Sequence, residues 1–63
     1  MITNLQRIRK EAGLTQKELA ERSSIPLRSI QAYETNSRSI SKIKVDNAIK
    51  LAKVLKCKIE DLL

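Results

Sequence analysis

The side chains in this chain that could do chemistry are hydrogen-bond donors and positive charges, and their types do not suit catalysis. The 63 residues contain no histidine, one cysteine and one glycine. Without an imidazole, no serine or cysteine has the usual general base, and one glycine is too few for a phosphate-cradling loop. Carboxylate or lysine chemistry would need a pocket that so small a domain hardly provides. We therefore expect no enzymatic activity and no cofactor.

The composition also bears on where the chain works. Cys57 is the only cysteine, so neither an intramolecular disulfide nor a cysteine-based metal site can form, and we expect a packed thiol and no metal. No apolar run approaches the ~18 residues of a membrane-spanning helix. The first four residues, MITN, do not resemble a signal peptide. We expect a cytoplasmic protein with no membrane contact.

The positive charge is concentrated in the middle of the sequence. The formal net charge is +6, and residues 35–58 contain seven basic side chains against a single acidic one, Asp46. A basic stretch of this kind is typical of a surface that binds phosphates. The alternative is surplus lysine that serves only solubility. Nucleic acid is the partner class that this pattern favours.

Local signals predict two helices in the first third of the chain. Thr3 can cap the first helix, and Gly13, which follows its last apolar position, can end it in a left-handed conformation. Thr15 and Glu18 form a capping box for a second helix that should end near Ser23. We expect a turn to follow.

Pro26 suits the first turn of a third helix, which should cover about residues 26–35. At 100° per residue, Ile30 and Tyr33 share one face and can join Ile25 in the core. The opposite face carries Arg28, Gln31, Ala32 and Thr35, with Leu27 at its edge. This polar face is the one that we expect to meet a partner.

The remainder is predicted as a polar, basic segment and two further helices. Ile40 and Ile43 should anchor the segment at 36–44, and an apolar arc predicts a helix over 45–55, followed by a short turn of helix at 59–63. Strand signals are nearly absent. We therefore predict a single all-α domain covering residues 1–63, with five helices.

Four sequence blocks occur in order along the chain: LTQKELA at 14–20, IQAYE at 30–34, LAKVL at 51–55 and IEDLL at 59–63. Together they resemble the Cro/repressor-type helix-turn-helix family, also called the XRE family. No single block is specific, but the ordered set covers essentially the whole chain. The resemblance implies a compact lambda-repressor-like domain in which helices 2 and 3 form the helix-turn-helix. Helix 2 would cross the DNA backbone and helix 3 would enter the major groove.

The chain departs from the family pattern at three places. Ser24 stands where the turn usually has glycine, and a positive φ there costs serine energy. Pro26 replaces the usual Ser or Thr, which removes a polar cap. The loop after Glu34 is a few residues longer than usual, so its path over DNA is open.

Family geometry and the helical wheel assign the DNA base contacts to Leu27, Arg28, Gln31 and Ala32. Arg28 can donate to O6 and N7 of a guanine, and Gln31 can pair with an adenine; either residue could instead bind a phosphate. Leu27 and Ala32 can touch thymine methyl groups. Their alternatives are burial at the helix edge for Leu27 and a simple spacer role for Ala32.

The resemblance also assigns DNA phosphate contacts. Gln16 lies at the start of the second helix, where its side chain and the free amides can hold a phosphate, while Lys17 is either a phosphate contact or a solvated charge. Beyond the third helix, the expected phosphate contacts are Thr35, Asn36, Ser37, Arg38 and Lys42. In the family, an Arg late in helix 1 often pairs with a Glu that ends helix 3, which implies a structural ion pair between Arg9 and Glu34.

These features predict a sequence-specific regulator of transcription, a repressor, that binds double-stranded DNA as a homodimer on a near-palindromic operator. The expected dimer interface consists of Leu55, Cys57, Ile59, Leu62 and Leu63. The alternative is that Leu62 and Leu63 only complete the core. A different class of function is a protein-interaction module, such as an antitoxin or an adaptor with a protein partner. RNA binding is disfavoured, because the chain has no aromatic stacking platform.

Overall fold

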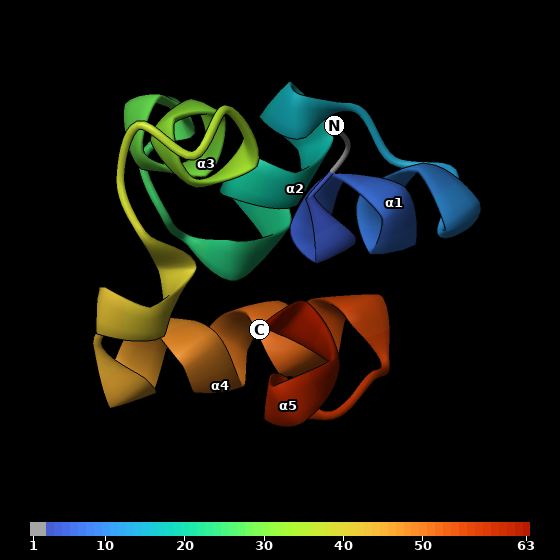
Figure 1. Cartoon of the computed structure of the whole chain (residues 1–63). Coiled ribbons are helices and arrows are strands. Elements are labelled where there is room, and N and C mark those ends of the chain that lie inside the picture. The colour runs from blue at the N-terminus through green and yellow to red at the C-terminus, as the bar shows by residue number, and fades with distance from the viewer. Residues whose placement is uncertain (1–2) are drawn as a thin grey trace.

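Five α-helices and one short 3₁₀ turn make up the computed structural model, which describes residues 3–63 (Figure 1). Their bounds are α1 Asn4–Glu11, α2 Gln16–Ser23, α3 Leu27–Glu34, η1 Ile40–Lys42, α4 Val45–Leu55 and α5 Ile59–Leu62. The prediction of an all-α domain with five helices is confirmed. The first two residues of the predicted domain lie outside the described residues.

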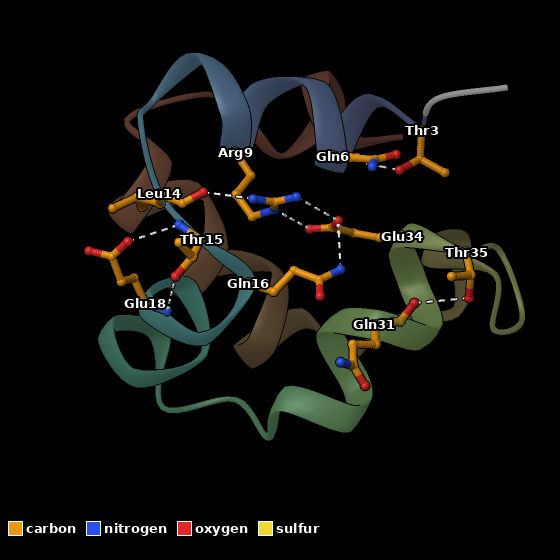
Figure 2. Close-up of polar contacts among 10 residues, drawn as sticks. All are labelled: Thr3, Gln6, Arg9, Leu14, Thr15, Gln16, Glu18, Gln31, Glu34 and Thr35. Carbon is orange, nitrogen blue, oxygen red and sulfur yellow. Dashed lines mark hydrogen bonds and ion pairs between the residues drawn. The ribbon is translucent and has the colours of Figure 1, made fainter.

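Side-chain caps begin the first two helices, as their sequences predict. The Thr3 hydroxyl accepts a hydrogen bond from the backbone amide of Gln6 at 3.2 Å. Thr15 and Glu18 form the reciprocal capping box: the Glu18 amide donates to Thr15 Oγ1 at 3.1 Å, and the Thr15 amide donates to Glu18 Oε1 at 3.0 Å (Figure 2). Each cap of this kind stabilises a helix by about 1 kcal/mol. The caps therefore fix the residues at which α1 and α2 begin.

Left-handed residues follow the ends of α1, α2, α3 and α4. Gly13 has φ +75°, and after it the Leu14 amide bonds back to the Arg9 carbonyl at 3.2 Å. Ser24 has φ +59°, the positive value that its place in the turn requires. Asn36 and Lys56 have similar values, 62° and 53°. Asn36 tolerates this conformation, whereas the side chains of Ser24 and Lys56 disfavour it. The backbone bonds that follow these two residues, Ile25 N to Ala20 O at 3.2 Å and Cys57 N to Ala52 O at 3.0 Å, offset that cost.

Helix α3 begins at Leu27, one position later than the sequence predicts. Pro26 therefore lies just before the helix. It is the residue before α3 rather than part of the first turn, and its carbonyl accepts from the amides of Ser29 and Ile30 at 2.9 and 3.2 Å. Its ring offers no side-chain cap, so the first turn of α3 begins uncapped. The helix ends at Glu34, within the predicted range.

The core lies where the two groups of helices meet. Figure 1 shows α4 and α5 on one side, facing α1, α2 and α3 on the other. Leu5, Leu19, Ile30 and Leu51, from four different helices, are completely buried. Further buried apolar residues pack around them: Ala20, Ile25, Tyr33, Leu55 and Leu62. The predicted inward positions of Ile25, Ile30 and Tyr33 are confirmed, and Ile40 and Ile43 anchor the segment after α3 by packing against this core.

The apolar arc of α4 is only partly used by the core. Ala48, Leu51 and Leu55 are buried, whereas Val45 is 70% exposed and Ile49 38% exposed.

Within residues 3–63, no helix combines the length and apolar character needed to cross a membrane. The same residues contain no cluster of three or more metal-binding side chains.

Candidate nucleic-acid interface

One face of α3 is open to solvent and carries the residues that were expected to contact bases. Leu27, Arg28 and Gln31 are exposed and Ala32 is half-buried. The other face, with Ile30 and Tyr33, is buried in the core. The amphipathic pattern of α3 therefore presents a guanidinium, an amide and two apolar groups outward, which is the set of groups that can read base edges in the major groove.

Arg28 is free to bind a ligand. Within residues 3–63, the ion pairs are Arg7–Glu11 and Arg9–Glu34, so Arg28 has no acidic side chain within bonding distance. The first turn of α3 also contains no acidic residue. An exposed guanidinium without an internal partner keeps all of its donors available for a base or a phosphate.

Arg9 and Glu34, the expected ion pair, are in contact inside the domain. Arg9 Nε donates to Glu34 Oε2 at 2.6 Å, and the other arm of the guanidinium donates to Oε1 at 3.1 Å. Arg9 also donates to the Leu14 carbonyl at 2.6 Å (Figure 2). Both side chains are more than nine-tenths buried. This bidentate pair joins the end of α1, the loop before α2 and the end of α3 in one rigid contact.

The expected phosphate contacts fall into two groups. Gln16 and Lys17 begin α2, where the first backbone amides have no acceptor within the helix, and Lys17 is exposed. The second group, which is exposed throughout, follows α3: Thr35, Asn36, Ser37, Arg38 and Lys42. Two sets of expected phosphate contacts therefore flank α3 in sequence. The start of α2 precedes it, and a run of hydroxyl, amide and basic side chains follows it.

The segment after α3 is tied back to that helix. The Arg38 amide donates to the Ala32 carbonyl at 3.1 Å, and the Arg38 guanidinium lies 5.8 Å from the centroid of the Tyr33 ring. The Thr35 hydroxyl bonds the Gln31 carbonyl at 2.9 Å and the Ser37 hydroxyl at 2.9 Å. The predicted phosphate contact Arg38 is thus held close to the C-terminal end of α3.

Sequence reasoning missed one contact at this site. Gln16 Nε2 donates to Glu34 Oε1 at 3.1 Å, so Gln16 joins the buried pair (Figure 2). The two residues are 18 positions apart and lie on different helices. No periodicity or spacing in the sequence links the two residues. The family resemblance assigns a role to each of them but does not imply a contact between them.

The expected dimer residues do not all face solvent. Leu55 and Leu62 are buried within the core of one copy, so they have little surface left for a second copy. For Leu62, burial supports the alternative of completing the core. Cys57 is half-buried, and this burial, with the nearby Asp61 charge, raises the pKa of its thiol. Ile59 is 37% exposed and Leu63 59% exposed.

The comparisons with known proteins agree with this geometry. A family model described as helix-turn-helix matches residues 5–62, which is nearly the whole chain. No curated protein and no solved structure matched the chain in the corresponding searches. The matched range includes α2, the turn at Ser24, α3 and the helices that support them. The chain therefore belongs to the Cro/C1-type helix-turn-helix family of DNA-binding regulators.

Proposed function

We propose that this protein is a sequence-specific repressor of transcription that binds double-stranded DNA as a homodimer on a near-palindromic operator. The observation that carries the proposal is the exposed face of α3, whose donors have no acidic partner within residues 3–63 and whose helix is fixed to α1 by the buried Arg9–Glu34 pair. A rigid helix with free donors can enter the major groove without first breaking internal contacts.

In this proposal the bases are read from α3. Arg28 donates to O6 and N7 of a guanine, and Gln31 pairs with an adenine, each bidentate pair discriminating by roughly 1–3 kcal/mol. Leu27 and Ala32 contact thymine methyl groups. The half-buried position of Ala32 supports close approach of the helix to the base edges.

Phosphates on both sides of the groove orient the domain. Gln16, Lys17 and the amides at the start of α2 bind one backbone strand, where the helix dipole favours an anion. Thr35, Asn36, Ser37, Arg38 and Lys42 bind the other side. The net positive charge of residues 35–58 supports this arrangement, and it makes binding sensitive to salt through counterion release.

Two copies are proposed because one α3 covers only a few base pairs. Two half-sites about one helical turn apart, roughly 34 Å, would supply the affinity and specificity that one copy lacks. The exposed side chains of Ile59 and Leu63 support a small contact between copies. Repression is the outcome that operator occupancy alone provides, since a bound dimer excludes other proteins from the same DNA.

The test is selection from a random double-stranded DNA library at near-physiological salt, followed by sequencing of the retained DNA. We expect an enriched motif with two related half-sites. Binding without enrichment that vanishes as salt rises would reduce the interaction to phosphate attraction and overturn the proposal.

A protein-interaction module, such as an antitoxin or an adaptor, is the second candidate. The exposed apolar side chains of Leu27, Val45 and Ile49 favour it, because such groups on a small domain can contact a protein. An antitoxin of this type can bind DNA as well as its protein partner, whereas a dedicated adaptor would yield no motif from the library. Substitution of Arg28 would then leave the interaction with the protein partner unchanged.

A further inference from the structure

The side-chain amide of Gln16 is held by a charged group inside the domain. Figure 2 shows the Gln16 side chain reaching from the start of α2 to Glu34 at the end of α3. The Gln16 Nε2–Glu34 Oε1 distance is 3.1 Å, and Gln16 is half-buried. A glutamine at the first position of a helix ordinarily has many rotamers available, so this bond selects one of them.

Glu34 is itself unable to turn away. Its carboxylate accepts from Arg9 Nε, from the second arm of Arg9 and from Gln16 Nε2, and it is 5% exposed. Arg9 is in turn bound to the Leu14 carbonyl, just before α2. The guanidinium offsets the carboxylate charge, so an anion that approaches Gln16 meets a neutralised pair rather than a lone negative charge.

The bond to Glu34 uses only part of what Gln16 can donate. A primary amide nitrogen carries two N–H donors. One N–H points to Glu34, and within residues 3–63 the second N–H has no acceptor. Because the first N–H is bonded to a carboxylate that is itself held in place, the directions open to the second N–H are restricted as well. A donor that is already oriented loses less conformational entropy when it binds.

We propose that Glu34 is a positioning residue for DNA binding: through its hydrogen bond to Gln16 it holds the second N–H of that amide ready for a DNA phosphate. The inference rests on the proposed function, in which Gln16 binds a phosphate. It adds that the ion pair supporting α3 also prepares the phosphate contact of α2, so one carboxylate joins the base-reading helix to the backbone-binding helix.

A double-mutant cycle tests this coupling. Affinity for the selected operator duplex is measured for the parent protein, Gln16→Ala, Glu34→Gln and the double variant, at a temperature where circular dichroism shows each to be folded. We expect Glu34→Gln to lower affinity about tenfold in the parent and less than about twofold in the Gln16→Ala background, as for a hydrogen bond to a charged group. Equal losses in both backgrounds would overturn the proposal.

Gln31→Ala provides the matched control. Gln31 is also a glutamine of the proposed interface, but within residues 3–63 its side chain makes no hydrogen bond to Glu34. The losses caused by Gln31→Ala and Glu34→Gln should therefore simply add. Coupling of the same size to both glutamines would mean that Glu34 acts only through general stability, and the proposal would fail.

Nuclear magnetic resonance on the parent protein covers the case in which the Glu34 variant does not fold. In the free protein, the Gln16 side-chain amide should exchange with water more slowly than that of exposed Gln31, and its signals should move when duplex is added. An unprotected Gln16 amide, or one unmoved by duplex, would overturn the proposal. If the parent binds no duplex at all, the proposed function itself fails; if it binds and the cycle shows no coupling, only the role of Glu34 fails.

Discussion

At the scale of single residues, the Arg9–Glu34 pair illustrates how much of a small domain can depend on two side chains. Removal of one partner leaves the other charged, buried and uncompensated, which costs roughly 3–5 kcal/mol. A domain of this size has a total stability of only several kcal/mol. We therefore expect Arg9→Ala and Glu34→Ala each to shift the cooperative unfolding transition strongly or to abolish it, measured by circular dichroism during thermal or urea unfolding. A variant that melts like the parent would contradict this.

Arg28 allows a second prediction at the same scale, because its two proposed partners have different signatures. If Arg28 reads a guanine, Arg28→Ala should relax specificity at one base position and cost about 1–3 kcal/mol there. If Arg28 binds a phosphate, Arg28→Ala should weaken binding to all DNA sequences alike. The slope of log K against log salt concentration should then fall in magnitude by about one. We expect the first result, and repetition of the library selection with Arg28→Ala measures it. A uniform loss would reassign Arg28 to the backbone.

At the scale of helices and turns, local sequence predicted what local forces decide. Thr3, Thr15 and Gly13 act within a few residues of themselves, and each begins or ends a helix where the sequence indicates. The contact between Gln16 and Glu34 depends instead on how α2 and α3 pack, which no local pattern encodes. The prediction that Leu55 and Leu62 lie at a dimer interface has a related difficulty, because both are part of the core. An apolar pattern shows that a face will be covered, but not whether the same copy or another copy covers it.

The turn between α2 and α3 carries a third prediction. Ser24 holds φ +59°, a conformation that glycine adopts without steric cost. Ser24→Gly should relieve this strain, but glycine also raises the entropy of the unfolded chain, which opposes the gain. The net effect should be a free energy of unfolding that is higher by roughly 0.5–1 kcal/mol. Ser29→Gly, within α3, is the control and should lower stability by about the same amount. Urea unfolding of the two variants compares them, and a loss of stability in Ser24→Gly would contradict the assigned strain.

The capping box of α2 predicts a dependence on pH. Hydrogen bonds from the backbone and side chain of Thr15, with the Arg22 charge, lower the pKa of Glu18 below its ordinary value of 4.5. Because the folded pKa is the lower one, the contribution of Glu18 is complete above its ordinary pKa and is lost as pH falls through the folded pKa. Glu18→Gln should be less stable than the parent at neutral pH, and the difference should vanish in acid. A pH-independent difference would contradict the role of the charge.

At the scale of the whole molecule, the proposed operator requires two copies of the chain to lie side by side. The fold offers little exposed apolar surface at the expected dimer interface to hold them together. Ile59 and Leu63 expose apolar surface, but Leu55 and Leu62 belong to the core. So small an apolar contact cannot hold two copies together alone, because association costs several kcal/mol before any contact is counted. We therefore expect a monomer in solution that dimerises on DNA, where two half-sites hold the copies side by side and raise their effective concentration.

This expectation yields a prediction with a matched control. Ile59→Asp should weaken binding to a duplex with two half-sites by removing cooperativity, and should leave binding to a single half-site unchanged. Ile49→Asp places the same charge on α4 at a side chain of nearly equal exposure, 38% against 37% for Ile59. It should not affect cooperativity. Titrations of both duplexes, with sedimentation of the free protein, distinguish the outcomes. Equal loss on the single half-site would mean that Ile59 supports the fold or the DNA contact, and the two copies would then have to meet through another surface.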